Sequence, residues 1–145
     1  MTMERILVGL DGSARAPAVL AAAVDLARRI GAKVFLYRAV GIPAELPAPA
    51  LSVSPGEVAA LLERLATDQL ADLAKAVPPE ILGGLRVSLA VPWQGVCEAA
   101  HRERAELIVI GSHGYGGIDR LLGTTAAKVV NHSEQSVLVV KAQAA

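Results

Sequence analysis

The sequence predicts a single α/β domain, residues 1–145, built on a doubly wound five-stranded parallel sheet with four main helices. Short apolar segments alternate with helical segments, which is the order that right-handed βαβ crossovers produce. The strand segments are nearly continuous apolar runs, as expected when helices cover both faces of a sheet. The chain has 145 residues and is 53% apolar, which suits one domain with its own core.

The first half of the chain contains two predicted strands and two predicted helices. Each strand is a short apolar run, and the turn residues Asp11 and Gly12 close the first one. Each helix carries apolar residues at helical spacing, and Gly31 and the pair Pro78–Pro79 are typical helix stops. In order, the elements are the strand Arg5–Leu10, the helix Ala14–Ile30, the strand Lys33–Val40, the proline-rich loop Gly41–Pro55 and the helix Gly56–Val77.

The second half continues the same alternation with three strands and two helices. Because parallel sheets bind ligands beyond the carboxyl ends of their strands, the residues that follow each strand are the first candidates for a site. In order, the elements are the strand Leu85–Val91, the helix Gly95–Arg104, the strand Leu107–Ile110, the helix Thr124–Asn131 and the strand Ser136–Lys141.

The glycine-rich segment Gly111–Thr125 is the strongest candidate for a binding site. It follows a strand and ends at a helix start, so glycine amides and helix amides would face one point and could bind a phosphate. The hydroxyls of Thr124 and Thr125 would donate to phosphate oxygens or cap the helix. The alternative is a surface loop whose glycines only form turns. The segment contains neither a P-loop nor the dinucleotide-binding fingerprint.

Composition argues against several classes of function. Basic and acidic residues number 14 each, and no dense basic run occurs, so binding to nucleic acid or to a membrane surface is not expected. No apolar run is long enough to span a bilayer and the first residues lack a signal-peptide pattern, so we expect a cytoplasmic protein. The lone Cys97 excludes an internal disulfide and is expected to pack on a helix. The histidines are scattered, so no metal site is expected.

Several motifs resemble the universal stress protein family along nearly the whole chain. They are Ile6–Ser13, Ala105–Gly114, Gly123–Thr124 and Ser136–Val140, in the order and on the elements where the family has them. The resemblance implies a Rossmann-like sheet of the adenine nucleotide alpha hydrolase-like type, with strand order 3-2-1-4-5. It also implies a homodimer and, in one branch of the family, ATP binding through the pattern G-x2-G-x9-G-(S/T).

The resemblance implies where an adenine nucleotide binds, which is ATP or a related ligand that can bring Mg²⁺ with its phosphates. The glycine pattern and its threonines would hold the phosphates, Asp11 would contact the adenosine, and the backbone of Val40 would read the adenine edge. A carboxylate accepts hydrogen bonds from an amine or a ribose hydroxyl. Asp11 is also suited to form a turn that caps the first helix, and both roles are compatible. The expected site residues are Leu10, Asp11, Ser13, Ala39, Val40, Ile110, Gly111, His113, Gly114, Gly123, Thr124 and Thr125.

One interval departs from the family pattern. Eight residues separate Gly114 from Gly123, where the pattern has nine. One residue changes the reach of an extended segment by about 3.5 Å, so the loop between the two phosphate walls must be reshaped. Gly116 and Gly117 accept the unusual backbone angles that such reshaping requires. We expect the site to be retained with an altered loop geometry.

These observations predict a regulatory ATP-binding protein of the stress response rather than an enzyme. The sequence offers no nucleophile with an evident base and no Walker-type lysine. The apolar last strand, Val137–Val140, is suited to pair with a second copy, whereas the alternative is a covered edge in a monomer. We also expect a regulatory protein partner, which the sequence does not identify. The alternative functions are a nucleotide-free dimeric interaction protein of the same fold and a slow ATP-hydrolysing enzyme.

Overall fold

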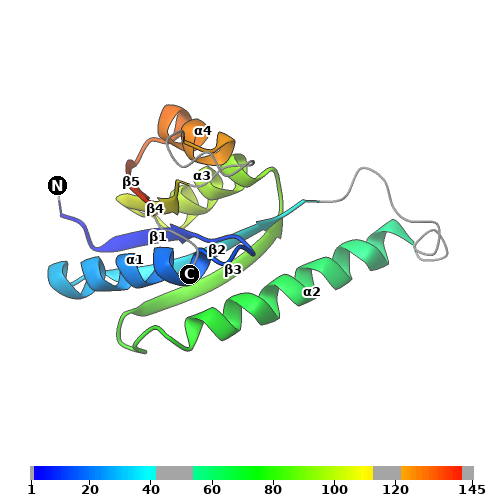
Figure 1. The fold of residues 1–145 in the computed structure, drawn as a ribbon, viewed down its shortest axis with the longest axis horizontal. Coiled ribbons are helices and arrows are strands. Elements are labelled where there is room, and N and C mark those ends of the chain that lie inside the picture. Colours follow the sequence, from blue (N-terminus) through cyan, green and yellow to red (C-terminus); the bar gives the residue numbers. More distant parts are fainter. Residues whose placement is uncertain (1, 42–53, 113–121, 142–145) are drawn as a thin grey trace.

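A computed structural model describes residues 2–41, 54–112 and 122–141 and confirms the predicted α/β fold (Figure 1). All neighbouring strands pair in parallel, in the order β3-β2-β1-β4-β5. No helix in these three ranges has the length and apolar character needed to cross a membrane. The strands are β1 (Arg5–Gly9), β2 (Lys33–Val40), β3 (Leu82–Leu89), β4 (Leu107–Gly111) and β5 (Ser136–Val140), and the helices are α1 (Ala16–Ile30), α2 (Pro55–Ala74), α3 (Pro92–Arg102) and α4 (Thr124–His132).

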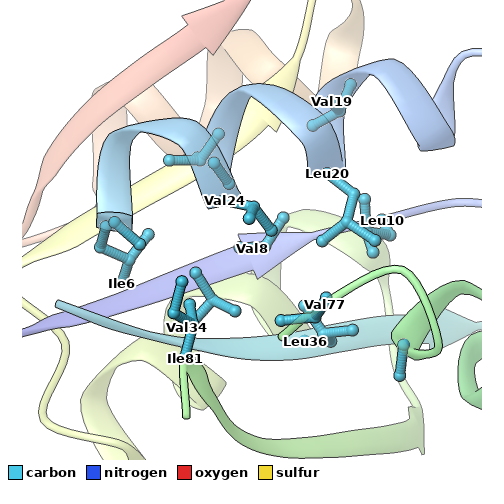
Figure 2. Packing of buried hydrophobic residues seen from close by; sticks show 14 of the residues in the cluster. Ile6, Val8, Leu10, Val19, Leu20, Val24, Val34, Leu36, Val77 and Ile81 are labelled. Carbon is cyan, nitrogen blue, oxygen red and sulfur yellow. The ribbon is translucent and has the colours of Figure 1, made fainter. Parts of the chain in front are cut away.

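Successive residues of the central strands point into two apolar cores, one on each face of the sheet. Ile6 and Val8 of β1 pack toward α1 and α2, and both are fully buried (Figure 2). Leu7 points the other way and packs with residues of α3 and α4. Figure 1 shows α1 and α2 on one side of the sheet and α3 and α4 on the other. The continuous apolar runs in the strands are thus explained by burial on both faces.

The predicted element boundaries agree with the structure to within three residues. Gly31 ends α1 with φ of +73°, a left-handed conformation that glycine adopts readily. The predicted start of the third strand at Leu85 is wrong, because β3 begins at Leu82. Any Cβ at Gly83 would collide with the ring of Phe35, so a strand at this position requires glycine.

The predicted start of the third helix at Gly95 is also wrong, because α3 begins at Pro92. Proline suits the first turn of a helix, where its missing N–H has no partner to lose. Cys97 lies on this helix, as predicted, and is half-buried. Burial raises the pKa of its thiol, so Cys97 remains protonated and weakly nucleophilic at neutral pH.

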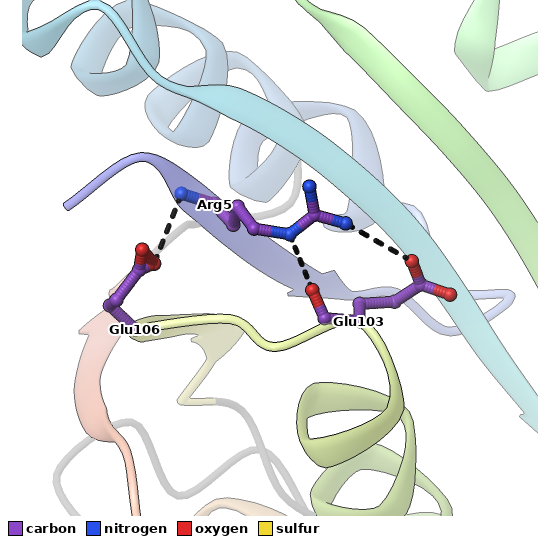
Figure 3. A network of polar contacts seen from close by, with 3 residues as sticks. All are labelled: Arg5, Glu103 and Glu106. Atoms are coloured by element: carbon purple, nitrogen blue, oxygen red, sulfur yellow. Dashed lines mark hydrogen bonds and ion pairs between the residues drawn. The ribbon is translucent and has the colours of Figure 1, made fainter.

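A polar network ties together the amino ends of β1 and β4 (Figure 3). The Glu106 carboxylate accepts the backbone amides of Glu4 and Arg5, both at 3.2 Å. Arg5 Nε donates to the Glu103 carbonyl at 2.5 Å, and Arg5 Nη2 lies 3.7 Å from the Glu103 carboxylate. The same guanidinium lies 4.3 Å from the centre of the Phe35 ring. These contacts stabilise the end of the sheet opposite the carboxyl ends of the strands.

Candidate functional site

A cavity of about 420 Å³ lies at the carboxyl ends of β1, β2 and β4, beside the first turns of α1, α3 and α4. β1 and β4 are neighbours in the sheet, while α1 and α4 pack on opposite faces of it, so the direction of winding reverses between these two strands. Parallel sheets bind ligands at such a point. The cavity brings together these residues predicted from the sequence: Leu10, Asp11, Ser13, Ala39, Ile110, Gly111, Thr124 and Thr125.

Asp11 forms a tight turn directly after β1. Its Oδ1 accepts the backbone amide of Ser13 at 2.9 Å, and Ser13 Oγ accepts the amide of Arg15 at 3.2 Å. The expectation that the Asp11 turn caps the first helix is not met, because the residue at the N-cap of α1 is Arg15 and no side chain caps that helix. Asp11 lies too far upstream, so its carboxylate shapes the turn instead and lines the cavity.

The first turn of α4 brings backbone amides to the same cavity. Gly123 is its N-cap, with φ of −62° and ψ of 162°, and as a glycine it has no side chain that could cap the helix. Thr124 and Thr125, the first helical residues, line the cavity. The first amides of a helix lack partners within the helix, and they lie at the positive end of its dipole. This wall of the cavity is therefore suited to an anion.

The walls between these polar groups are mainly apolar. Gly9 leaves no space for a side chain, since a Cβ there would lie 2.9 Å from Ile110 Cγ2. Among the lining residues that the structure describes, Asp11 is the only one that carries a charge. Apolar walls with a few polar groups are typical of sites for small organic ligands. The buried apolar residues that line the cavity are Leu10, Ala16, Val19, Val96, Ile110 and Ala126.

Four predicted site residues are not among the described residues that line the cavity. Val40 is not among the residues that line the cavity, and its carbonyl accepts the amide of Ala90 at 3.1 Å. Gly123 is buried, and its amide donates to the Ser112 carbonyl at 3.0 Å, so this amide is already in use. His113 and Gly114 lie outside the described residues. The phosphate wall that the structure describes thus consists of Gly111 and the start of α4.

Sequence reasoning missed several lining residues. Gly9 and Gly12 flank the predicted Leu10 and Asp11, and Pro92 follows the third strand, so proximity to strand ends could have identified them. The helical residues carry no such signal, because the face of a helix that reaches a cavity depends on how the helix packs. The missed residues are Gly9, Gly12, Ala16, Val19, Pro92, Val96 and Ala126.

The predicted site residues gather in this one cavity, and the described part of the chain offers no metal-binding cluster beside it. Within residues 2–41, 54–112 and 122–141, no group of three or more His, Cys, Asp or Glu is placed to hold a metal ion. Another cavity, of about 390 Å³, lies over β2 and β3 beside α3, and its lining includes none of the predicted site residues.

Comparisons with known proteins agree with one another. A family model described as the Universal stress protein family matches residues 2–141. A universal stress protein of Methanocaldococcus jannaschii is 28% identical over 146 residues, which cover 95% of this chain and 82% of that protein. The structure of UspA from Lactobacillus plantarum has a TM-score of 0.76 and 25% identity, and the match covers 97% of this chain and 99% of that one. A universal stress protein solved in complex with cAMP has a TM-score of 0.63 and 23% identity, and the match covers 100% of both chains.

Proposed function

Because this chain belongs to the universal stress protein family, we propose that it binds an adenine nucleotide in the cavity at the carboxyl ends of β1, β2 and β4. The observation that carries the proposal is that one cavity is lined both by Asp11 and by the first turn of α4, whose N-cap is a glycine. A carboxylate suits the amine and hydroxyls of adenosine, and a helix N-terminus suits phosphate. These are the two polar parts of a nucleotide.

The start of α4 is the proposed phosphate site. Thr124 and Thr125 each offer a backbone amide and a hydroxyl, and Gly111 brings a backbone without a Cβ to the same cavity. Interaction of an anion with a helix N-terminus contributes about 0.3–1 kcal/mol at exposed positions and up to roughly 2 kcal/mol when partly buried. Several such donors acting together would hold one phosphate group firmly.

The turn after β1 is the proposed adenosine site. Asp11 accepts from adenosine, while Leu10, Ala39 and Ile110 offer apolar surface to the base. The cavity of about 420 Å³ lies within the range of roughly 300–1,000 Å³ typical of small-molecule sites. The complex of a structural relative with cAMP supports adenine as the base.

ATP with Mg²⁺ is the first candidate ligand, on the strength of the glycine pattern that ends at Gly123–Thr124. The described lining residues carry no positive charge, so α4, backbone amides and Mg²⁺ would have to balance the charge of a triphosphate. The ion would be held mainly by phosphate oxygens and water, with Asp11 as the nearest protein carboxylate in the cavity.

We further propose a regulatory homodimer that pairs through β5. This strand is at the edge of the sheet, and Leu138 is 40% exposed while Val130 on the adjacent α4 is 45% exposed. An apolar edge strand readily pairs with a second chain. Nucleotide binding would then shift the shape of the dimer or its affinity for a regulatory protein partner in a cytoplasmic stress response. The single cysteine is compatible with that reducing compartment.

Calorimetric titration with ATP and Mg²⁺ tests the binding proposal. We expect a saturable heat and a rise in Tm, because a ligand at 100 times its Kd stabilises the folded state by about 2.7 kcal/mol. AMP and cAMP in the same titration show whether a single phosphate is sufficient for binding, and GTP is the control for the base. Absence of heat and of a Tm shift with all three adenine nucleotides would refute the proposal.

A pair of matched variants locates the phosphate. Thr125→Val keeps the shape of the side chain and removes a hydroxyl from the cavity, whereas Thr67→Val makes the same change on α2. We expect weaker ATP binding in the first variant and unchanged binding in the second. Equal affinity of both variants and the wild type would place the phosphate elsewhere.

The shortened interval between Gly114 and Gly123 favours a second candidate, a nucleotide-free dimeric interaction protein of the same fold. Mass spectrometry of protein purified without added nucleotide distinguishes the two, because co-purified ATP, ADP or AMP contradicts the second candidate. The remaining candidate, a slow ATP-hydrolysing enzyme, requires steady phosphate release that Asp11→Ala abolishes.

A further inference from the structure

Arg38 of β2 touches two separate parts of the chain near the cavity. It pairs with Val87 in the sheet, and its Nη1 donates to Oε1 of Gln69 on α2. Its Nη2 lies against Gly12 in the turn after β1, since a Cβ built at Gly12 would be 2.9 Å from Nη2 and 3.4 Å from Cζ. One half-buried side chain thus links the turn that carries Asp11 to α2.

The turn after β1 connects the sheet to α1, and the Arg38 side chain adds a contact between this turn and β2. The sheet anchors the backbone as far as Leu10, whose amide donates to the Tyr37 carbonyl at 2.9 Å. Beyond that point Asp11 and Gly12 are exposed, and the bond between Asp11 and the Ser13 amide is local. A local bond fixes the shape of the turn but not its place relative to β2.

We propose that Arg38 is a positioning residue of the nucleotide site. It holds the Asp11–Ser13 turn against the end of β2 through Gly12, and Gln69 holds the guanidinium in turn. This role rests on the proposed binding of an adenine nucleotide, because it acts through the Asp11 carboxylate. Arginine suits the task because its guanidinium has several N–H donors in a fixed planar arrangement, so one nitrogen contacts Gly12 while the other donates to Gln69, whereas lysine has a single ammonium nitrogen.

Arg38 also carries a positive charge close to the site of an anionic ligand. The effect of this charge on affinity can be distinguished from the effect of positioning the turn. Adenosine has no phosphate, so a displaced turn weakens the binding of adenosine and AMP by the same factor. Loss of long-range attraction weakens the binding of AMP and leaves adenosine unaffected. The ratio of the two affinities therefore identifies the cause.

The test is to measure Kd for adenosine and for AMP in Arg38→Met, Arg38→Lys, Gln69→Leu and the control Arg64→Met. Arg64 is an exposed residue of α2, so the control removes the same charge without touching the turn. We expect Arg38→Met to weaken both ligands about five- to tenfold, a size typical of coupling through a neighbouring residue. We expect Arg38→Lys to restore little of this loss, Gln69→Leu to weaken both ligands about two- to threefold, and Arg64→Met to match the wild type.

Two results would overturn the positioning role while the proposed function stands. They are wild-type affinity for adenosine in Arg38→Met, and a loss confined to AMP. If the wild type binds neither of these ligands and neither ATP nor cAMP, the proposed function fails and the positioning role fails with it. The contact itself is tested in the ligand-free protein by NMR order parameters of the Gly12 and Ser13 amides. These should fall in Arg38→Met and remain unchanged in Arg64→Met, and unchanged values in Arg38→Met would contradict the proposal.

Discussion

Replacing Asp11 by Asn tests the adenosine site without removing the turn that carries it. Asp11 Oδ1 accepts the Ser13 amide at 2.9 Å, and an Asn side chain offers a carbonyl oxygen for the same bond. The substitution therefore removes mainly the negative charge. Hydrogen bonds to charged groups contribute about 1.5–3 kcal/mol and neutral ones about 1 kcal/mol. The expected loss is roughly 0.5–2 kcal/mol for one such bond, which raises the Kd for adenosine about two- to thirtyfold.

Asp11→Ala serves as the comparison, because it removes the turn bond as well as the charge. Loss of the exposed bond to the Ser13 amide lowers the free energy of unfolding by about 1 kcal/mol. This change lowers Tm by roughly 3–5 °C in a domain of this size. Asp25→Asn is the matched control, an exposed carboxylate on α1 that pairs with Arg29. Calorimetry with adenosine gives the affinities and thermal unfolding gives Tm. Wild-type affinity in Asp11→Asn would refute the charge-based contact, and wild-type affinity in Asp11→Ala as well would remove Asp11 from the site.

The remaining predictions concern the edge strand and the two cores. Leu138→Arg places a charge on the exposed edge of β5, so sedimentation velocity should show a monomer, and a dimer of wild-type stability would contradict the proposed interface. Tyr37→Phe removes the 2.6 Å bond to Ser88 Oγ and should lower the free energy of unfolding by about 1–2 kcal/mol. Burial raises the pKa of Tyr37 above 10.0, so its contribution is complete below pH 10 and declines as the pH rises further. Urea unfolding at neutral and alkaline pH should show a smaller alkaline decline in the variant, and an equal decline would refute this assignment. Leu70→Ala, at a fully buried position, should cost about 2–5 kcal/mol in urea unfolding. Leu61→Ala, at a position that is 51% exposed, is its control, and equal costs would contradict the burial.

Most element boundaries could be predicted because their signals are local. The stop at Gly31 depends only on the backbone of that residue, which has φ of +73°. The start of β3 could not be predicted from local sequence. A glycine is needed in the strand at position 83 because the Phe35 ring of β2 fills the space that a side chain would occupy. The order of the strands came from the family resemblance, since periodicity gives the elements and not their neighbours.

The site could be predicted where it lies next to a strand end. Asp11 follows β1, and Gly111 is the last residue of β4. The carboxyl ends of parallel strands meet at one edge of the sheet. Val19 and Val96 were missed because packing decides which side of a helix faces the cavity. The contact of Arg38 with the turn after β1 was missed for a related reason, because its geometry involves three elements that are distant in the sequence.

The hydrogen bond between the Gly123 amide and the Ser112 carbonyl, 3.0 Å long, joins the two residues that flank positions 113–122 of the sequence. Ser112 directly follows β4 and Gly123 directly precedes α4, so this bond holds the end of the strand beside the start of the helix. Closing a loop of eleven residues in place of ten costs only about 0.1 kcal/mol in chain entropy. The one-residue difference from the family pattern falls between these two residues and therefore changes the closure entropy little. We expect that changes of length between Ser112 and Gly123 leave the sheet and its helices folded, because the Ser112–Gly123 hydrogen bond lies outside the changed positions.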